Sequence, residues 1–335
     1  MEIIIDTFED IKQLDNNIDI DTLTINLKIF NFKLFENYRN KIKLLNCEDN
    51  HLISFEGLNF DIRELNCSDN NITSFKELKV PINHIYCSEN NITSFKGLKF
   101  PIGYLNCDYN KITSFRRLKV SIECLDCEGN QIESFKGLKF KIHSLNCMNN
   151  KITSFEKLKV PIYYLNCAYN RITSFNELKV KIDIIYCYCN NITSFEGLKY
   201  SINELHCASN NIDTFEGLKH SINILNCASN NIATFEELNV PINKLICYSN
   251  NITSFKGLKV KINSLYCCNN QIKSFKQLKI PIHKLDCCDN NITSFKGLKV
   301  KINSLYCNGN QIKSFEKLNI PINYIECYEN LLKYY

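Results

Sequence analysis

Cysteine is the residue type in this sequence with the most potential for chemistry. The 335-residue chain has nineteen cysteines, and fifteen of them recur every 20 residues from Cys47 to Cys327. Thiolates can bind metals or act as nucleophiles, but no Cys-x-x-Cys or Cys–His spacing recurs. Cys268 and Cys288 share the eighth position of neighbouring repeats, without a base placed beside them. We therefore interpret the repeated cysteine as a small apolar core residue and expect no catalytic and no metal-binding residues.

Sequence motifs of other enzymes are also missing. The chain has no Gly-rich phosphate loop, no His-Glu-x-x-His and no serine elbow. We expect a non-enzymatic protein that has no cofactor, no cofactor-binding residues and no small-molecule substrate.

Two polar rows accompany the cysteines. Asn fills the tenth position from Asn50 to Asn330 and could bind a ligand or satisfy backbone groups of a buried turn, which is the interpretation we favour. Lys recurs at the nineteenth position between Lys79 and Lys299 and could follow a polyanion. Acidic residues three positions earlier, such as Glu156 and Glu196, offset that charge.

All these rows belong to a 20-residue repeat that runs without insertion from Lys41. Fourteen full repeats end at Ile320, and a truncated fifteenth ends at Tyr335. Apolar residues at the fifth and seventh positions predict a short strand with one buried side. The three-residue spacing of the twelfth, fifteenth and eighteenth positions favours a 3₁₀ or extended return segment over an α-helix. Such a period is typical of a repeat solenoid.

The pattern Ile-x-x-Leu-x-Cys-x-x-Asn-x-Ile-x-x-Phe-x-x-Leu resembles the leucine-rich repeat. Its 20-residue length and the frequent Pro before the first Ile, as at Pro281, are similar to the short bacterial-type subclass. The composition, rich in Asn, Ile, Lys, Phe and Tyr and without Trp, resembles that of leucine-rich repeat proteins of giant DNA viruses of amoebae. The resemblance implies an arc with a parallel β-sheet on the concave face and a 3₁₀ or extended, non-helical convex side.

Residues 1–40 are expected to form an N-terminal cap, and residues 41–335 the solenoid. Residues 21–40 form a degenerate repeat, in which Ile25 and Leu27 take the two inward strand positions. A strand at residues 2–5 and a short helix near Phe8, Ile11 and Leu14 would close the end of the stack. The last repeat has no comparable cap, although Glu326 and Glu329 discourage edge pairing.

The fourth, sixth and eighth positions would form the concave face, where repeat proteins usually bind partners. Tyr and acidic residues are frequent there, and Lys occurs only at Lys244 and Lys284. Four neighbouring repeats combine apolar and aromatic residues with one His and one Lys, as Tyr-rich protein interfaces do. These residues are the candidate partner-binding patch: Ile184, Tyr186, Tyr188, His206, Ile224, Lys244, Ile246 and Tyr248.

Composition limits the remaining possibilities. A net charge of +5 does not suggest a nucleic-acid partner, and no apolar run is long enough to span a membrane. The first residues lack a basic region typical of a signal peptide, so we expect reduced thiols in the cytoplasm, that of a host if the source is viral. We expect a scaffold that binds a protein partner through the concave sheet face. The alternatives are a structural or filler protein of a particle, and polyanion binding through the Lys row.

Overall fold

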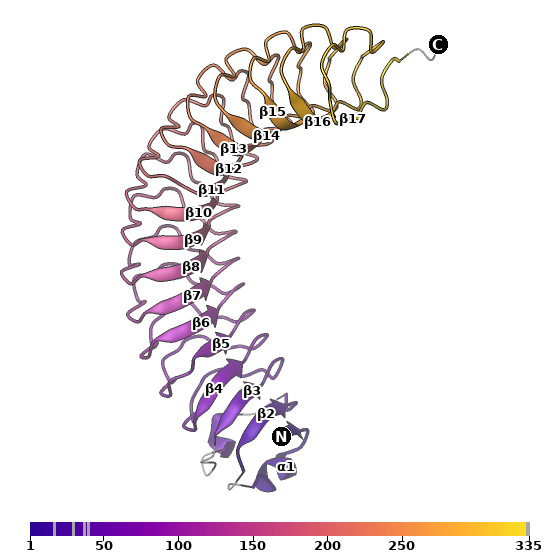
Figure 1. The fold of residues 1–335 in the computed structure, drawn as a ribbon. Helices are drawn as coiled ribbons and strands as arrows, with labels where there is room; N and C mark the ends of the chain where they lie inside the picture. The colour runs from indigo at the N-terminus through magenta and orange to yellow at the C-terminus, as the bar shows by residue number, and fades with distance from the viewer. Residues whose placement is uncertain (16–17, 29–30, 36–37, 39–40, 333–335) are drawn as a thin grey trace. The chain divides into compact units, whose positions relative to one another are not determined.

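In the computed structural model, short strands alternate with non-helical return segments along the chain (Figure 1). The structure describes residues 1–15, 18–28, 31–35, 38 and 41–332. The chain divides into two compact units. The N-terminal unit comprises residues 1–153 and 157–167, and the C-terminal unit comprises residues 154–156 and 168–335. By repeat position Tyr335 takes the place of the repeated Phe, and it lies outside the described residues.

In the N-terminal unit, parallel strands follow one another in chain order (Figure 1). Strands β3 and β4 pair Leu45 with Leu65, a shift of one 20-residue repeat. The elements of this unit are β1 (Glu2–Ile5), α1 (Phe8–Lys12), β2 (Ile20–Ile25), the 3₁₀ turn η1 (Phe32–Phe35), β3 (Ile42–Asn46), β4 (Ile62–Asn66), β5 (His84–Tyr86), β6 (Ile102–Asn106), β7 (Ile122–Asp126), β8 (Ile142–Asn146) and β9 (Ile162–Asn166).

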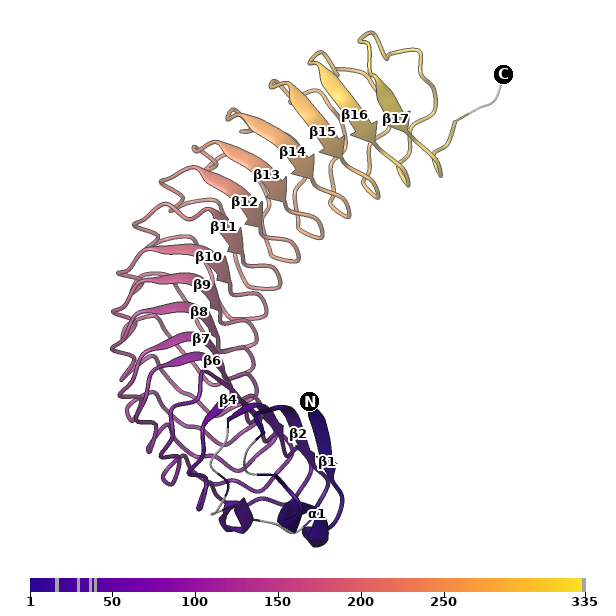
Figure 2. The same cartoon turned by 60° about the horizontal axis from the view of Figure 1, so that its bottom comes forward.

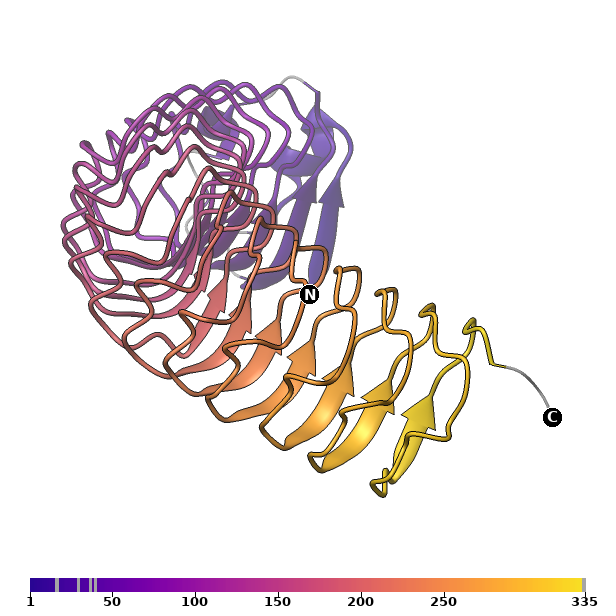
Figure 3. The same cartoon turned by 90° about the horizontal axis from the view of Figure 1, so that it is seen from above.

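The C-terminal unit is built in the same way. Its strands lie side by side in chain order (Figure 2) and point in one direction, as the orange and yellow arrows show (Figure 3). They are β10 (Ile182–Tyr186), β11 (Glu204–His206), β12 (Ile222–Asn226), β13 (Ile242–Ile246), β14 (Ile262–Tyr266), β15 (Ile282–Asp286), β16 (Ile302–Tyr306) and β17 (Tyr324–Glu326). Among the described residues only α1 and η1 are helical, so the prediction of a parallel, largely non-helical solenoid is confirmed.

The core consists of rows of identical or closely similar side chains. The second, fifth, seventh, twelfth, fifteenth and eighteenth positions are buried in the inner repeats. The fifteenth-position rings stack on one another, as Phe55 does on Phe75 with 6.1 Å between centroids and 7° between planes. Stacked repeats thus bury apolar surface that no single 20-residue segment could bury alone.

Tight turns explain the three-residue spacing of the return segment. The Leu58 N–H donates to the Phe55 carbonyl at 3.1 Å, and Leu218 donates to Phe215 at 3.3 Å in the other unit. One such bond spans three residues and closes a single β-turn, which is not continued into a helix. The prediction of a non-helical return segment is confirmed, with one turn per repeat instead of a 3₁₀ helix.

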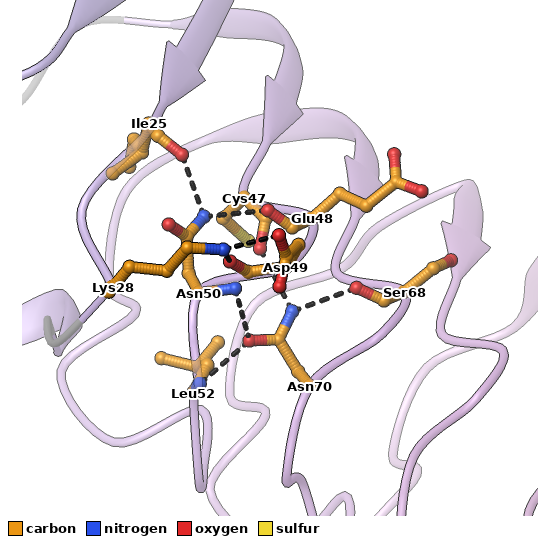
Figure 4. Close-up of polar contacts among 9 residues, drawn as sticks. All are labelled: Ile25, Lys28, Cys47, Glu48, Asp49, Asn50, Leu52, Ser68 and Asn70. Carbon is orange, nitrogen blue, oxygen red and sulfur yellow. Dashed lines mark hydrogen bonds and ion pairs between the residues drawn. The ribbon is translucent and has the colours of Figure 1, made fainter.

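The Asn row satisfies backbone groups of two repeats at once (Figure 4). Asn70 Nδ2 donates to the carbonyls of Cys47 and Ser68, both at 2.9 Å. It also lies 3.1 Å from the Cys67 carbonyl. Its Oδ1 accepts from the Leu52 N–H at 2.7 Å and from the Asn50 N–H at 3.2 Å. Asn70 is buried, so the interpretation of this row as a structural ladder agrees with the geometry.

The seventh-position cysteines are core residues, as predicted. Cys47 and Cys107 are fully buried, and each Sγ donates to a carbonyl of the next repeat at 3.2 Å. Burial raises the pKa of the Cys67 thiol and of its neighbours in the row. Cys327 differs because its side chain is half-exposed in the last repeat.

The N-terminal end matches the expected strand and helix but shifts the degenerate repeat. β1 and α1 lie where the sequence places them. In β2, however, Leu23 pairs with Leu45, a separation of 22 residues. The inward strand positions are therefore Leu23 and Ile25, so the assignment of Ile25 and Leu27 was wrong by two residues. Since the segment from β2 to β3 is two residues longer than a repeat, counting back by 20 misplaces the strand.

Candidate functional site

The fourth, sixth and eighth positions form the solvent-facing side of the strands, here called the outer sheet face. Strand geometry alternates these side chains with the buried fifth and seventh positions. In β12, Ile224 and Asn226 are partly exposed whereas Leu225 is fully buried. The side chains that a partner could contact are therefore those of the fourth, sixth and eighth positions, as the sequence predicts.

The C-terminal unit holds all eight residues of the candidate partner-binding patch on this face. Parallel pairing sets Glu204 between Ile184 and Ile224 in the fourth-position row. In the sixth-position row Asn226 separates His206 from Ile246. The isoleucines are therefore interrupted by polar residues and do not form one continuous apolar area.

The centre of the patch is a pair of stacked rings. Tyr186 and His206 have ring centroids 4.2 Å apart and planes 4° apart. His206 Nε2 also lies 3.4 Å from the Glu204 carboxylate. Stacking and the carboxylate both restrict the imidazole, so this part of the face is ordered before any partner arrives.

The eighth-position residues and Lys244 lie around this pair. Tyr188 packs edge-on against Tyr169 at 5.5 Å, and Tyr248 is 41% exposed. The Lys244 ammonium lies 5.4 Å from the centroid of the Tyr266 ring. Tyr266 thus extends the patch by one repeat through a cation–π contact.

Sequence reasoning missed several residues that the register brings into the patch. Glu204, Asn226 and Tyr266 are direct neighbours of predicted residues. Adding 20 to the number of each predicted residue would have found all three, because parallel pairing without insertion makes residues i and i+20 neighbours.

A separate acidic cluster lies on the outer sheet face of the N-terminal unit. The Tyr104 hydroxyl donates to Asp126 at 2.6 Å, and Asp108 Oδ1 accepts from the Glu128 N–H at 2.6 Å. Burial raises the pKa of Asp108 to about 6, and the nearby carboxylates act in the same direction. The sequence indicated acidic character on this face but not this change in proton affinity.

Two cysteines and an aspartate also meet on the outer sheet face, in the C-terminal unit. The Cys268 thiol donates to Asp286 Oδ1 at 2.8 Å. The two thiol sulfurs and a carboxylate oxygen of Asp286 all lie within 4.8 Å of one another, and all three residues are half-buried. Cys268 and Cys288 are recognisable from their shared repeat position, whereas Asp286 joins them only across neighbouring strands and has no ligand spacing within one segment.

A basic groove of about 530 Å³ follows the edge where the strands of the C-terminal unit begin. Its charged lining comes from Lys259, Lys261 and Lys301, together with His283, whereas no acidic residue lines it. Lys259 belongs to the nineteenth-position row, and Lys261 and Lys301 occupy first positions. The Lys row is thus locally reinforced beside the strand edge.

No helix in the described part of the chain has the length and apolar character needed to cross a membrane. No protein-family model matches the sequence, and no curated protein matches it either.

Solved structures with a similar fold were found. The structure of TLR13 in complex with ssRNA13 aligns with a TM-score of 0.72 at 17% identity, over 98% of this chain and 56% of the TLR13 chain. The APL1 leucine-rich repeat domain aligns with a TM-score of 0.56 at 16% identity, over 93% and 87% of the two chains. The Drosophila Toll–Spatzle complex gives 0.54 at 13% identity, over 98% and 61%. This chain therefore spans little more than half of the TLR13 chain.

Because the sequence identities are this low, these comparisons show similarity of architecture alone. That architecture agrees with the repeat pattern, the parallel pairing and the Asn ladder described above. The chain has the leucine-rich repeat fold.

Proposed function

We propose that the protein is a non-enzymatic scaffold that binds a protein partner through the outer sheet face of its C-terminal unit. The observation that carries this proposal is the Tyr186–His206 ring pair at 4.2 Å, set among Ile184, Ile224 and Ile246. Rigid aromatic side chains on a partly apolar surface are the residues that dominate protein interfaces.

The fold supports a macromolecular partner. Toll was solved in a complex with Spatzle, and TLR13 in a complex with ssRNA13. Repeat proteins use the extended face of the stacked strands for such contacts. For this chain the Tyr and Ile content of the face favours a protein, because single-stranded nucleic acid is held in positively charged grooves.

The first experiment identifies the partner and the surface together. The full chain, with a photo-crosslinking residue at Asn226, is exposed to candidate proteins, and crosslinked peptides are identified by mass spectrometry. Asn226 lies inside the patch without belonging to the predicted set. The same label at Asn146, the sixth position of an N-terminal repeat, is the control.

The second experiment measures the contribution of the two tyrosines. The Tyr186→Ala/Tyr248→Ala variant is expected to bind the identified partner at least about tenfold more weakly, because truncation of a tyrosine at an interface hot spot costs about 2 kcal/mol or more. The Tyr86→Ala/Tyr328→Ala variant removes the same side chains from the same repeat positions outside the patch. Unchanged affinity in the first variant, or a loss accompanied by a lower melting temperature, rejects the site.

Polyanion binding is the second candidate function, favoured by the basic groove. The groove gathers Lys259, Lys261 and Lys301 without an acidic residue in its lining. Retention of the protein on heparin that falls steeply with salt would support it. A Lys259→Ser/Lys301→Ser variant should then elute earlier, whereas Lys199→Ser, from the same row in another repeat, should not.

Two further proposals concern the compartment and the source of the protein. The row of buried thiols supports a reducing compartment such as the cytoplasm, because cysteine can serve as a core residue there without oxidation. The composition supports a viral source of the kind found in amoebae. Localisation of a tagged protein in infected cells would test both.

A further inference from the structure

Neighbouring repeats bring three metal-ligand side chains together in the C-terminal unit. Cys268 and Cys288 hold the eighth positions of two adjacent repeats, and Asp286 holds the sixth position of the second. The pairing of β14 with β15 and the Asn269 N–H bond to the Cys288 carbonyl at 3.1 Å continue the register past the strands. The three side chains therefore emerge on the same face from adjoining backbone.

The geometry of the side chains suits one small cation. The two sulfurs and one carboxylate oxygen lie within 4.8 Å of one another, and Cys268 Sγ is 2.8 Å from Asp286 Oδ1. Around a tetrahedral zinc ion, with Zn–S near 2.3 Å and Zn–O near 2.0–2.2 Å, ligand atoms are about 3.4–3.8 Å apart. Each of the present separations would have to change by no more than about 1 Å to match those values.

We propose that Cys268, Asp286 and Cys288 form a site for a thiophilic divalent cation of the zinc type. Two thiolates and a carboxylate supply three ligands, and water completes the tetrahedron from the solvent side. Soft sulfur ligands exclude Mg²⁺ and Ca²⁺, which prefer oxygen.

Binding exchanges two protons for one metal ion. Each thiol loses its proton to solvent and forms a metal–sulfur bond, while the Asp286 carboxylate is the third donor; no electron is transferred. Without a metal, the Cys268 thiol keeps its proton and donates it to Asp286 Oδ1 in a hydrogen bond. A divalent cation replaces the proton that Cys268 shares with the carboxylate and compensates two of the three negative charges of the site.

The repeats themselves supply substitutions that the fold tolerates. Other repeats carry Ser at the eighth position, as Ser68 and Ser88, and Asn at the sixth, as Asn66. Replacing Cys268 and Cys288 by Ser, or Asp286 by Asn, therefore introduces residues that the same backbone already holds. Cys124 and Cys189 are half-buried thiols elsewhere in the chain and provide a control with the same number of cysteines removed.

The test is a titration of the reduced, metal-free full chain with Co²⁺, a spectroscopic substitute for Zn²⁺. We expect a thiolate-to-cobalt charge-transfer band that saturates at one equivalent and disappears when Zn²⁺ is added. The Cys268→Ser/Cys288→Ser variant should lack the band, and the Cys124→Ser/Cys189→Ser variant should retain it. Asp286→Asn should weaken binding at least about tenfold, because even outer-shell partners of metal ligands contribute that much.

Three results would overturn the proposal. They are the absence of the band in the reduced wild-type chain, its survival in the Cys268→Ser/Cys288→Ser variant, and equal affinity in Asp286→Asn. Melting curves of each variant without metal establish that it is folded. A thermal shift of the wild type with Zn²⁺ that the double-serine variant lacks is an independent readout of the same site.

Discussion

The side-chain amide of Asn70 donates to the carbonyl of Cys47, 23 residues earlier and one repeat away, at a distance of 2.9 Å. The same amide group accepts from the Leu52 N–H of that preceding repeat. Each repeat is thus joined to its neighbour by a buried polar contact as well as by apolar packing, and the contact recurs along both units. The consequences of this arrangement can be measured one residue at a time.

Removal of one amide should destabilise the stack more than removal of a surface charge. Asn190 accepts from the Ile172 N–H at 2.8 Å and donates to the Cys187 carbonyl at 3.1 Å. Asn190→Ala leaves these buried groups unpaired, at a cost of about 1–3 kcal/mol in the free energy of unfolding. Lys199→Ala in the same repeat should change it by less than about 0.5 kcal/mol. Equal effects in denaturant melts would contradict the assignment of buried and exposed positions.

Truncation of one ring in the Phe row should be more costly still. Phe195 is fully buried and its ring stacks on Phe215, with centroids 6.2 Å apart. Phe195→Ala creates a cavity between two close-packed repeats, and the expected loss is about 3–5 kcal/mol. Phe195→Leu, which fills part of the volume, is the matched control and should recover part of the loss. A smaller effect for Ala than for Leu in the same melts would be inconsistent with a packed row.

Thiol reagents should distinguish the two classes of cysteine. Cys147 and Cys207 are fully buried, and burial raises the pKa of both thiols, so native labelling should be slow. Cys124 and Cys189 are half-buried and should react first, which timed alkylation with peptide mass spectrometry would show. Cys327 should react faster than Cys307, since the last repeat leaves it partly uncovered. Fast labelling of Cys147 would refute the core assignment.

The acidic cluster of the N-terminal unit should make stability depend on pH near 6. The folded state raises the pKa of Asp108 from 3.8 to about 6, chiefly through burial and also through Asp126 and Glu128. The folded state therefore binds this proton more tightly than the unfolded state does. The contribution of this proton to the free energy of unfolding is complete below about pH 4 and is lost as the pH rises through 6.

Replacing Asp108 by Asn removes the charge and keeps an oxygen that can accept from the Glu128 N–H. We expect Asp108→Asn to raise the melting temperature at pH 7.5 relative to wild type, with a smaller difference at pH 4.5. Asn308 holds the same repeat position, so the fold accommodates the side chain. Glu48→Gln, at the exposed eighth position of the first repeat, is the control. A stabilisation by Asp108→Asn that is independent of pH would contradict the assignment.

The fold could be predicted from the sequence because the chemistry of each buried position is repeated many times. The Ile, Cys and Phe rows allow few other arrangements, and the cap strand and helix followed from apolar spacing at residues 2–14. The 22-residue offset of Leu23 from Leu45 could not be predicted, because the segment between them lacks the repeated Cys and Asn that mark the position of each later strand.

The outer sheet face was harder to predict, because its residues vary from repeat to repeat. Sequence reasoning selected residues by type within each repeat, so it found Tyr186 and His206 but not their ring stacking. It paired Cys268 with Cys288 without seeing that Asp286 completes the group. Both relationships depend on side-chain directions across neighbouring strands, which follow from the register and not from local spacing.

Because no residue is inserted between Lys41 and Ile320, the gene can lose or gain whole repeats without a shift in the buried rows. Loss of residues 269–288 by recombination between repeated segments would join Cys268 to Asp289, and every buried row would continue unbroken. The outer sheet face would change at that point, since Asp286 and Cys288 would be gone and Cys268 would adjoin Asn308. Unequal crossing-over can therefore produce new surface combinations in a single event, at little risk to folding.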